Sequence, residues 1–326
     1  MINTKSINLY KRSQFLLLAI VLIFVLVACS QAAAPGEPVT LKIAILPILD
    51  TLPMYVAEEE GLFAENNVSV EFIAVGSAPE RDQIISAGQA DGMINEAVST
   101  VFYNTDQTRV QIVRYARTAT SEQHLFSILA AGDSGITTVD QLKGVEIGVS
   151  HGTVIEYLTD RLLQNQGFTD DEIATVAIPG IGDRLALLGS GELQAGMLPE
   201  PPTSLAQQGG AVVGIDDTTY PEVSFSTISF RKEIIDDHPE AIRGFLSALE
   251  EATRRINANP DQYSDLLIEK ELVPPPLMGS FDVPKYPAAG VPTQEQWDDA
   301  LAWTIENGLN DAQVSYHESV TDAYLP

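Results

Sequence analysis

Residues 88–96 read GQADGMINE and residues 191–200 read GELQAGMLPE, so the pattern Gly-Met-(Ile/Leu)-x-Glu occurs at 92–96 and again at 196–200. Each copy follows a segment with a helical pattern and a glycine, and each ends in a glutamate just after a short apolar run. A buried strand that leads into a loop has this form. The repeat therefore predicts equivalent strands in two related α/β units.

Alternating strand and helix patterns surround both copies and support two units, at 39–117 and 125–215. The main strands are expected at 39–46, 68–75, 91–94 and 109–116 in the first unit, and at 125–131, 145–150 and 210–215 in the second. Strands that alternate with helices indicate a mostly parallel sheet covered on both faces. We therefore expect an α/β fold with two lobes.

The order of the units along the chain predicts two crossings between the lobes, near Thr118–Leu125 and near Asp216–Ser226. Lobe 1 would then comprise 39–120 plus 222–326, and lobe 2 would comprise 121–221. Two C-terminal segments have helical patterns, and the second begins with a capping box, Thr293 with Gln296. These C-terminal helices are expected to pack back on lobe 1.

The first 28 residues have the pattern of a targeting segment. Basic residues precede an apolar run from Phe15 to Ala28, which at 14 residues is shorter than the roughly 20 needed to span a bilayer. The run ends in LVAC (26–29), which resembles the bacterial lipobox, whose cysteine becomes the lipidated first residue. We predict a lipoprotein signal peptide at 1–28, lipidation of Cys29 and a flexible tether at 29–38; the alternative is a stray cysteine at the end of a signal anchor.

The charge and length of the chain narrow its possible roles. The formal net charge is −27, and removal of 1–28, with three basic residues and no acid, would leave 298 residues with a charge of −30. Such a surface repels nucleic acid and anionic lipid headgroups. A chain of this length is long for one core and suits two lobes.

Signatures of catalysis are missing from the sequence. It contains no Gly-x-Ser-x-Gly elbow, no HExxH and no phosphate-binding Gly-x-x-x-x-Gly-Lys, and its four histidines are not in metal-ligand spacing. The segment GIGDRL (180–185) has two glycines of a dinucleotide fingerprint but Leu185 in place of the third. We predict a protein that is not an enzyme and that uses no cofactor and no metal.

Candidate ligand-binding residues lie in the loops at the carboxyl ends of the expected strands, where open α/β sheets bind their ligands. Capping of a helix explains Asp50, Ser77 and Ser150 at least as well as contact with a ligand. Arg81 and Arg184 lie one turn into the helices that follow such loops. The predicted ligand-binding residues are Asp50, Tyr55, Ser77, Asn95, Glu96, Ser150, His151, Thr153 and Glu200.

Glu96 and Glu200, which end the two copies of the pattern, are expected on opposite walls of a cleft between the lobes. Carboxylates accept hydrogen bonds and repel anions, which suggests a ligand with N–H donors or positive charge, such as an amine-bearing heterocycle that stacks on Tyr55. Two alternatives remain open. One glutamate could pair with an arginine, and Pro201 and Pro202 could turn Glu200 toward solvent.

Three segments resemble a known family. LPMYVAEEEGLFAENNVSVEFI (52–73), SAGQADGMI (86–94) and TVDQLKGVEIGVSHGTVIEYL (138–158) are similar to the solute-binding proteins of ABC importers that handle sulfonates, taurine, nitrate and thiamine pyrimidine precursors. The similarity runs in order over about 40–260. It implies a two-lobed periplasmic-binding-protein-like fold of type II, with a ligand cleft between the lobes.

The resemblance also implies a role outside the cytoplasm. A monomer, held to the membrane by lipid on Cys29, would capture a small molecule and deliver it to an ABC permease and its ATPase. The ligand would be an amine-bearing heterocycle such as a thiamine pyrimidine precursor or, alternatively, an anion such as a sulfonate, taurine or nitrate. Less favoured are a sensory receptor and an enzyme like the pyrimidine synthases of this fold, which use a cysteine-rich motif.

Overall fold

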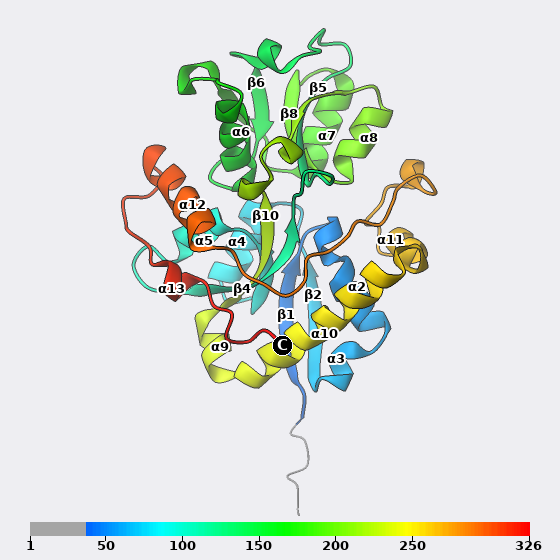
Figure 1. Cartoon of the computed structure of the whole chain (residues 1–326), viewed down its shortest axis with the longest axis vertical. Helices are drawn as coiled ribbons and strands as arrows, with labels where there is room; N and C mark the ends of the chain where they lie inside the picture. The colour runs from blue at the N-terminus through cyan, green and yellow to red at the C-terminus, as the bar shows by residue number, and fades with distance from the viewer. Residues whose placement is uncertain (1–36) are drawn as a thin grey trace, which may run out of the picture. The chain divides into compact units, whose positions relative to one another are not determined.

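The computed structural model describes residues 37–326, so Cys29, the predicted signal peptide and most of the predicted tether lie outside the described residues. Two five-stranded sheets organise the described chain (Figure 1). The first consists of β1 (Val39–Ile45), β2 (Val68–Ala74), β3 (Gly92–Asn95), β4 (Val110–Thr118) and β10 (Phe225–Arg231). The second consists of β5 (Phe126–Ala130), β6 (Glu146–Val149), β7 (Ala174–Ala177), β8 (Ala195–Pro199) and β9 (Val212–Asp216).

The two sheets have matching strand orders, β2-β1-β3-β10-β4 and β7-β6-β8-β5-β9. The two copies of the repeated pattern form β3 and β8, and each of these strands lies third in its sheet and is buried along its whole length. The predicted equivalence of the two strands is therefore confirmed, as is the two-lobed α/β fold.

One strand in each sheet runs against its neighbours. β10 is antiparallel to β3 and β4, and β5 is antiparallel to β8 and β9. Each of these two strands follows a connection that crosses from one sheet to the other, Thr118 to Phe126 and Asp216 to Phe225. The expectation of a mostly parallel sheet missed these reversed strands, because a short apolar run does not encode strand direction. The lobe boundaries themselves stay a prediction.

Helices cover both sheets. The α-helices near the first sheet in sequence are α2 (Leu52–Glu59), α3 (Leu62–Glu65), α4 (Ala78–Ser86) and α5 (Ala97–Tyr103). Those between β5 and β10 are α6 (Val154–Asn165), α7 (Ile181–Ser190) and α8 (Pro202–Gln208). The later helices are α9 (Lys232–Asp237), α10 (Pro239–Ala258), α11 (Ser264–Glu269), α12 (Gln294–Glu306) and α13 (Tyr316–Ser319). Among the described residues, no helix is both long enough and apolar enough to cross a membrane.

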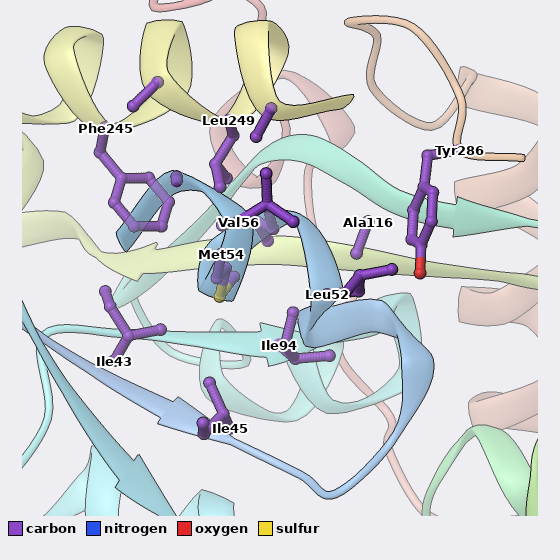
Figure 2. Packing of buried hydrophobic residues seen from close by; sticks show 14 of the residues in the cluster. Ile43, Ile45, Leu52, Met54, Val56, Ile94, Ala116, Phe245, Leu249 and Tyr286 are labelled. Atoms are coloured by element: carbon purple, nitrogen blue, oxygen red, sulfur yellow. The ribbon is translucent and has the colours of Figure 1, made fainter. Parts of the chain in front are cut away.

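The main core of the first sheet lies under α10. Figure 2 shows Phe245 and Leu249 of α10 directed toward Met54 and Val56 of α2, and all four side chains are almost completely buried. Full burial of such side chains contributes about 1.5–3 kcal/mol each. Gly244 permits the close approach of α10 to α3, because a Cβ at this position would lie 2.5 Å from the backbone oxygen of Asn66.

The C-terminal helices divide their contacts between the two sheets. α10 contacts α2 and α3, as expected for packing on lobe 1, whereas α12 contacts α5 and is hydrogen-bonded to α6 (Figure 1). The predicted capping box of Thr293 and Gln296 begins α12. α12 therefore joins helices that belong to different sheets.

Candidate functional site

A cavity of about 60 Å³ lies where residues of the two sheets meet. Most of its lining is apolar, and it includes Ile48, Ile94, Phe126 and Ile155. The polar lining comes from the loop after β1 (Asp50), from α4 (Arg81), from the end of β3 and the start of α5 (Asn95, Glu96), from β10 (Ser226), from the loop after β6 (Ser150) and from α7 (Arg184). An apolar cavity with a few convergent polar groups is the usual form of a small-molecule site.

The cavity is small for a ligand site. A space of this size holds a few water molecules or a compact ion, since one water needs roughly 10–15 Å³. Sites for drug-sized ligands measure about 300–1,000 Å³. A ligand larger than a compact ion would therefore require the two walls to separate.

Arg81 and Glu96 form a buried pair on the wall that belongs to the first sheet. A guanidinium nitrogen of Arg81 lies 3.4 Å from Glu96 Oε1, and a second nitrogen donates to the carbonyl of Ile94. Glu96 also accepts from the backbone N–H of Ser99 and so caps α5. Burial raises the pKa of Glu96, an effect that the charge of Arg81 and the Ser99 hydroxyl partly offset. The carboxylate of Glu96 is thus largely engaged within its own wall.

On the same wall, Asp50 connects the loop after β1 to β10 through a hydrogen bond. Its carboxylate accepts a hydrogen bond from the Ser226 hydroxyl, and it lies 3.9 Å from a guanidinium nitrogen of Arg117. Arg117 is buried, and its Nε has no hydrogen-bond partner among the described residues. The close partner of the Asp50 carboxylate is therefore the Ser226 hydroxyl, and Arg117 lies at the longer distance of 3.9 Å.

Arg184 is the charged group that lines the opposite wall. It is 1% exposed; its Nε donates to the carbonyl of Met197 at 2.9 Å, and its Nη1 donates to the carbonyls of Ile178 and Pro179. Within residues 37–326, no carboxylate lies within 4.0 Å of its guanidinium and no hydrogen bond uses its Nη2. Burial lowers the pKa of Arg184 to about 10, with a small opposing effect of Asp183.

Two further polar atoms at the cavity have no hydrogen-bond partner among the described residues, Asn95 Oδ1 and Ser150 Oγ. Both side chains are at most 2% exposed. The amide nitrogen of Asn95 donates to Thr100 and Ser229, which leaves the oxygen free to accept from a ligand. An unpaired buried polar atom costs about 1–3 kcal/mol. A ligand that pairs with both atoms would recover part of that cost.

Five of the nine predicted ligand-binding residues lie outside the lining of this cavity: Tyr55, Ser77, His151, Thr153 and Glu200. Ser77 caps α4 by accepting from the backbone N–H of Glu80, and Thr153 caps α6 by accepting from Ile155 N–H. His151 pairs with Glu156 at 2.9 Å. Tyr55 packs edge-on against Phe72 and lies under the ammonium group of Lys270. Contact of these residues with a ligand stays a prediction.

Glu200 lines a different and more open hollow, with a volume of about 850 Å³. Its Oε1 lies 2.5 Å from His124 Nε2 and accepts from the Ser204 hydroxyl. The hydrogen bond to Glu200 raises the pKa of His124, although burial opposes it. Glu96 and Glu200 therefore face different hollows in this arrangement.

Sequence reasoning noted Arg81 and Arg184 but did not include them among the site residues. Both lie one turn into a helix, and a side chain there points back toward the helix N-terminus and so reaches the loop. Ser226 was missed because it lies in a strand that arrives from the second crossing. Within the described range, no group of three or more His, Cys, Asp or Glu side chains could hold a metal ion.

A match to a protein-family model shows which family the chain belongs to. The family model described as NMT1/THI5 like matches residues 49–263, which is more than half of the chain. The chain belongs to the NMT1/THI5-like family. A candidate binding protein of Brucella abortus (strain 2308) is 24% identical to this NMT1/THI5-like chain over 261 residues, which cover 78% of the chain and 77% of the relative.

Solved structures share the fold of this NMT1/THI5-like protein. The alkanesulfonate-binding protein SsuA of Xanthomonas axonopodis pv. citri, bound to MOPS, matches with a TM-score of 0.73 and 17% identity over 88% of this chain and 99% of that one. The nitrate-binding protein NrtA of Synechocystis PCC 6803 matches with a TM-score of 0.70 and 16% identity over 88% and 87%. The desulfurization enzyme DszB also matches, with a TM-score of 0.64 and 14% identity over 87% and 97%.

Proposed function

We propose that this chain is the extracytoplasmic solute-binding component of an ABC importer, held to a membrane by lipid on Cys29. Membership of the NMT1/THI5-like family, the relative named as a candidate binding protein and the fold shared with SsuA and NrtA support this role. The apolar cavity, with polar groups from both sheets, supports capture of a small molecule. The partners are the permease and its ATPase, and the chain works as a monomer.

The ligand is an anion whose negative group binds to Arg184. The observation that carries this proposal is that Arg184, alone among the buried arginines of the described chain, has no carboxylate within 4.0 Å; Arg81, Arg114 and Arg117 each have one. A buried cation without a counter-charge is costly, and an anionic ligand removes that cost. The guanidinium nitrogen Nη2, which donates to no carbonyl within residues 37–326, can donate to an oxygen of a carboxylate or of a tetrahedral or trigonal oxyanion.

An amine-bearing heterocycle, such as a thiamine pyrimidine precursor, is the second candidate. Asp50 and the free Oδ1 of Asn95 support it, because both accept hydrogen bonds and both line the cavity. Two opposed glutamates would have supported such a ligand. Glu96 is instead bound to Arg81 and Ser99, and Glu200 lines another hollow, so the case for an amine is weaker.

A non-catalytic role is proposed although DszB shares the fold. The pyrimidine synthases of this fold use a cysteine-rich motif, whereas this chain has one cysteine, Cys29, the predicted site of lipid attachment. The genes next to this one distinguish an importer component from a receptor that signals and does not transport. Genes for a permease and an ATPase next to this one are the expected result.

The test of the ligand class is a thermal-shift screen of sulfonates, nitrate, carboxylates, amines and pyrimidines, followed by calorimetric titration of each hit. With an anionic hit, Arg184→Gln is expected to weaken affinity roughly 10–150-fold, which corresponds to about 1.5–3 kcal/mol for a lost charge-assisted hydrogen bond. Arg114→Gln is the matched control, because it removes a buried arginine outside the cavity. A cationic hit whose affinity Arg184→Gln leaves unchanged would overturn the anion assignment and leave the transport role in place.

A further inference from the structure

Helix α12 contacts α5 and α6, the two helices whose N-termini line the cavity. Its apolar face, including Trp297 and Ala300, shares a hydrophobic cluster with Ala97, Val98 and Val101 of α5. The N-terminus of α5, at Glu96, lines the cavity on one side. The N-terminus of α6, at Val154 and Ile155, lines it on the other side.

The contacts between α12 and α6 are polar and specific. The Tyr157 hydroxyl donates to Asp299 Oδ2 at 2.6 Å, and Arg161 Nε donates to the same oxygen at 3.1 Å. One turn further along α12, Trp303 Nε1 donates to Asp160 Oδ2 at 2.7 Å, and the Trp303 ring meets the ring of Tyr157 edge to face. Since three side chains of α6, at positions 157, 160 and 161, are hydrogen-bonded to α12, α6 cannot shift along or away from α12 without losing these bonds.

The chain around α12 is in turn fixed to the first sheet. The hydroxyl of Tyr115, in β4, donates to Gln296 Oε1 at 2.5 Å, and its backbone N–H donates to Gly290 O at 2.7 Å. Beyond the helix, the backbone N–H of Thr321 donates to Ile112 O at 3.0 Å. α12 therefore links the two sheets in addition to the two crossing connections, and it contacts the second of these where Gln296 Nε2 donates to the carbonyl of Glu222.

We propose that α12 sets the spacing of the two walls of the cavity, and that Asp299 and Trp303 are positioning residues that hold the N-terminus of α6 opposite that of α5. This inference rests on the proposed function only in taking the cavity as the ligand site. The two helix starts face the cavity, so a change in the position of α6 moves Ser150, Val154 and Ile155 relative to Asn95 and Glu96.

Hydrogen exchange of the protein without ligand tests the proposal directly. The backbone N–H groups of Gly152, Ile155, Glu156 and Tyr157 are hydrogen-bonded at the start of α6 and serve as probes. In Asp299→Ala their exchange is expected to accelerate about tenfold or more, while amides of β1 and β3 exchange as in the unchanged protein, because local opening costs less than global unfolding. Trp303→Phe, which retains the ring and loses the donor, is expected to accelerate the same probes less.

Asp298→Ala is the matched control, since it makes the same change one residue away on an exposed side of α12. Acceleration in the α6 probes that is equal in Asp299→Ala and Asp298→Ala would overturn the proposal. Acceleration spread evenly over β1, β3 and α6 would also overturn it, because that pattern reports a general loss of stability. Neither result depends on whether the protein transports a solute, so failure here is distinct from failure of the proposed function.

Discussion

The indole N–H of Trp303 donates to the carboxylate of Asp160 across the junction of α12 and α6, at 2.7 Å. Burial raises the pKa of Asp160 to about 6 from its ordinary 3.8, the bond from Trp303 lowers it, and the neighbouring Glu156 raises it further. Ionised Asp160 is therefore a cost to the folded state above pH 6.

The raised pKa of Asp160 makes the free energy of unfolding depend on pH. Between pH 4 and pH 6 the folded protein binds the proton of Asp160 more tightly than the unfolded chain does, so the contribution of this group to stability falls as the pH rises. Asp160→Asn removes the ionisation and keeps an acceptor for Trp303. It is expected to raise the free energy of unfolding at pH 7.5 by about 1–3 kcal/mol and to change it little at pH 4. Urea unfolding across this range checks it, and a difference between the two proteins that is constant with pH would contradict it.

Asp217 ties the two crossing connections together. Its buried carboxylate accepts from the backbone N–H groups of Leu125 and Phe126, at the end of the first crossing, and from the hydroxyl of Ser224 in the second. Asp217→Ala leaves both N–H groups unpaired and is expected to lower the free energy of unfolding by about 2–5 kcal/mol. Glu222→Ala, an exposed change in the same connection, is the control and should have an effect within about 0.5 kcal/mol by urea unfolding.

Gly244 is a test of close helix packing. In an exposed helix interior, Gly→Ala stabilises by about 1 kcal/mol, but at Gly244 the added Cβ meets the backbone oxygen of Asn66. Gly244→Ala is therefore expected to lower the melting temperature, with a net loss of about 1–3 kcal/mol. Gly189→Ala, in α7 with open space around the new Cβ, should raise the melting temperature instead. Equal effects of the two changes would show that α10 moves freely away from α3.

Cys29 tests the membrane anchor. If Cys29 is the lipidated first residue of the mature protein, Cys29→Ser is expected to block lipoprotein processing and to change membrane retention. Electrophoretic mobility and membrane fractionation measure both effects, and Ser30→Ala is the control for a change beside the predicted cleavage point. A Cys29→Ser protein that is cleaved and retained like the unchanged one would rule out the lipobox.

The strands and their order in the chain could be predicted well because their signal is local. The apolar runs at 39–46 and 91–94 and the capping box at Thr293 depend on neighbours in the sequence, and the structure has β1, β3 and α12 there. The direction of β5 and β10 could not be predicted, since it depends on how the chain returns from the other sheet.

The candidate site was only partly predictable for a related reason. Asp50, Asn95, Glu96 and Ser150 lie at or just after the ends of strands, and they do line the cavity. Whether a charge in such a position is free depends on residues distant in the sequence. Glu96 is engaged by an arginine 15 positions earlier, whereas no carboxylate of the described residues lies within 4.0 Å of the Arg184 guanidinium. The spacing of residues in the sequence does not show which buried charges are paired in the fold.

The position of β10 between β3 and β4 has a consequence for the growing polypeptide. The five strands of the second sheet follow one another in the chain, whereas β4 ends at Thr118 and β10 ends at Arg231. A ribosome adds those roughly 110 residues in about 6–22 s at 5–20 residues per second. During that time β3 and β4 have unpaired edges, which are templates for aggregation. A nascent chain can thus complete its second sheet while its first sheet still depends on a chaperone or on continued synthesis.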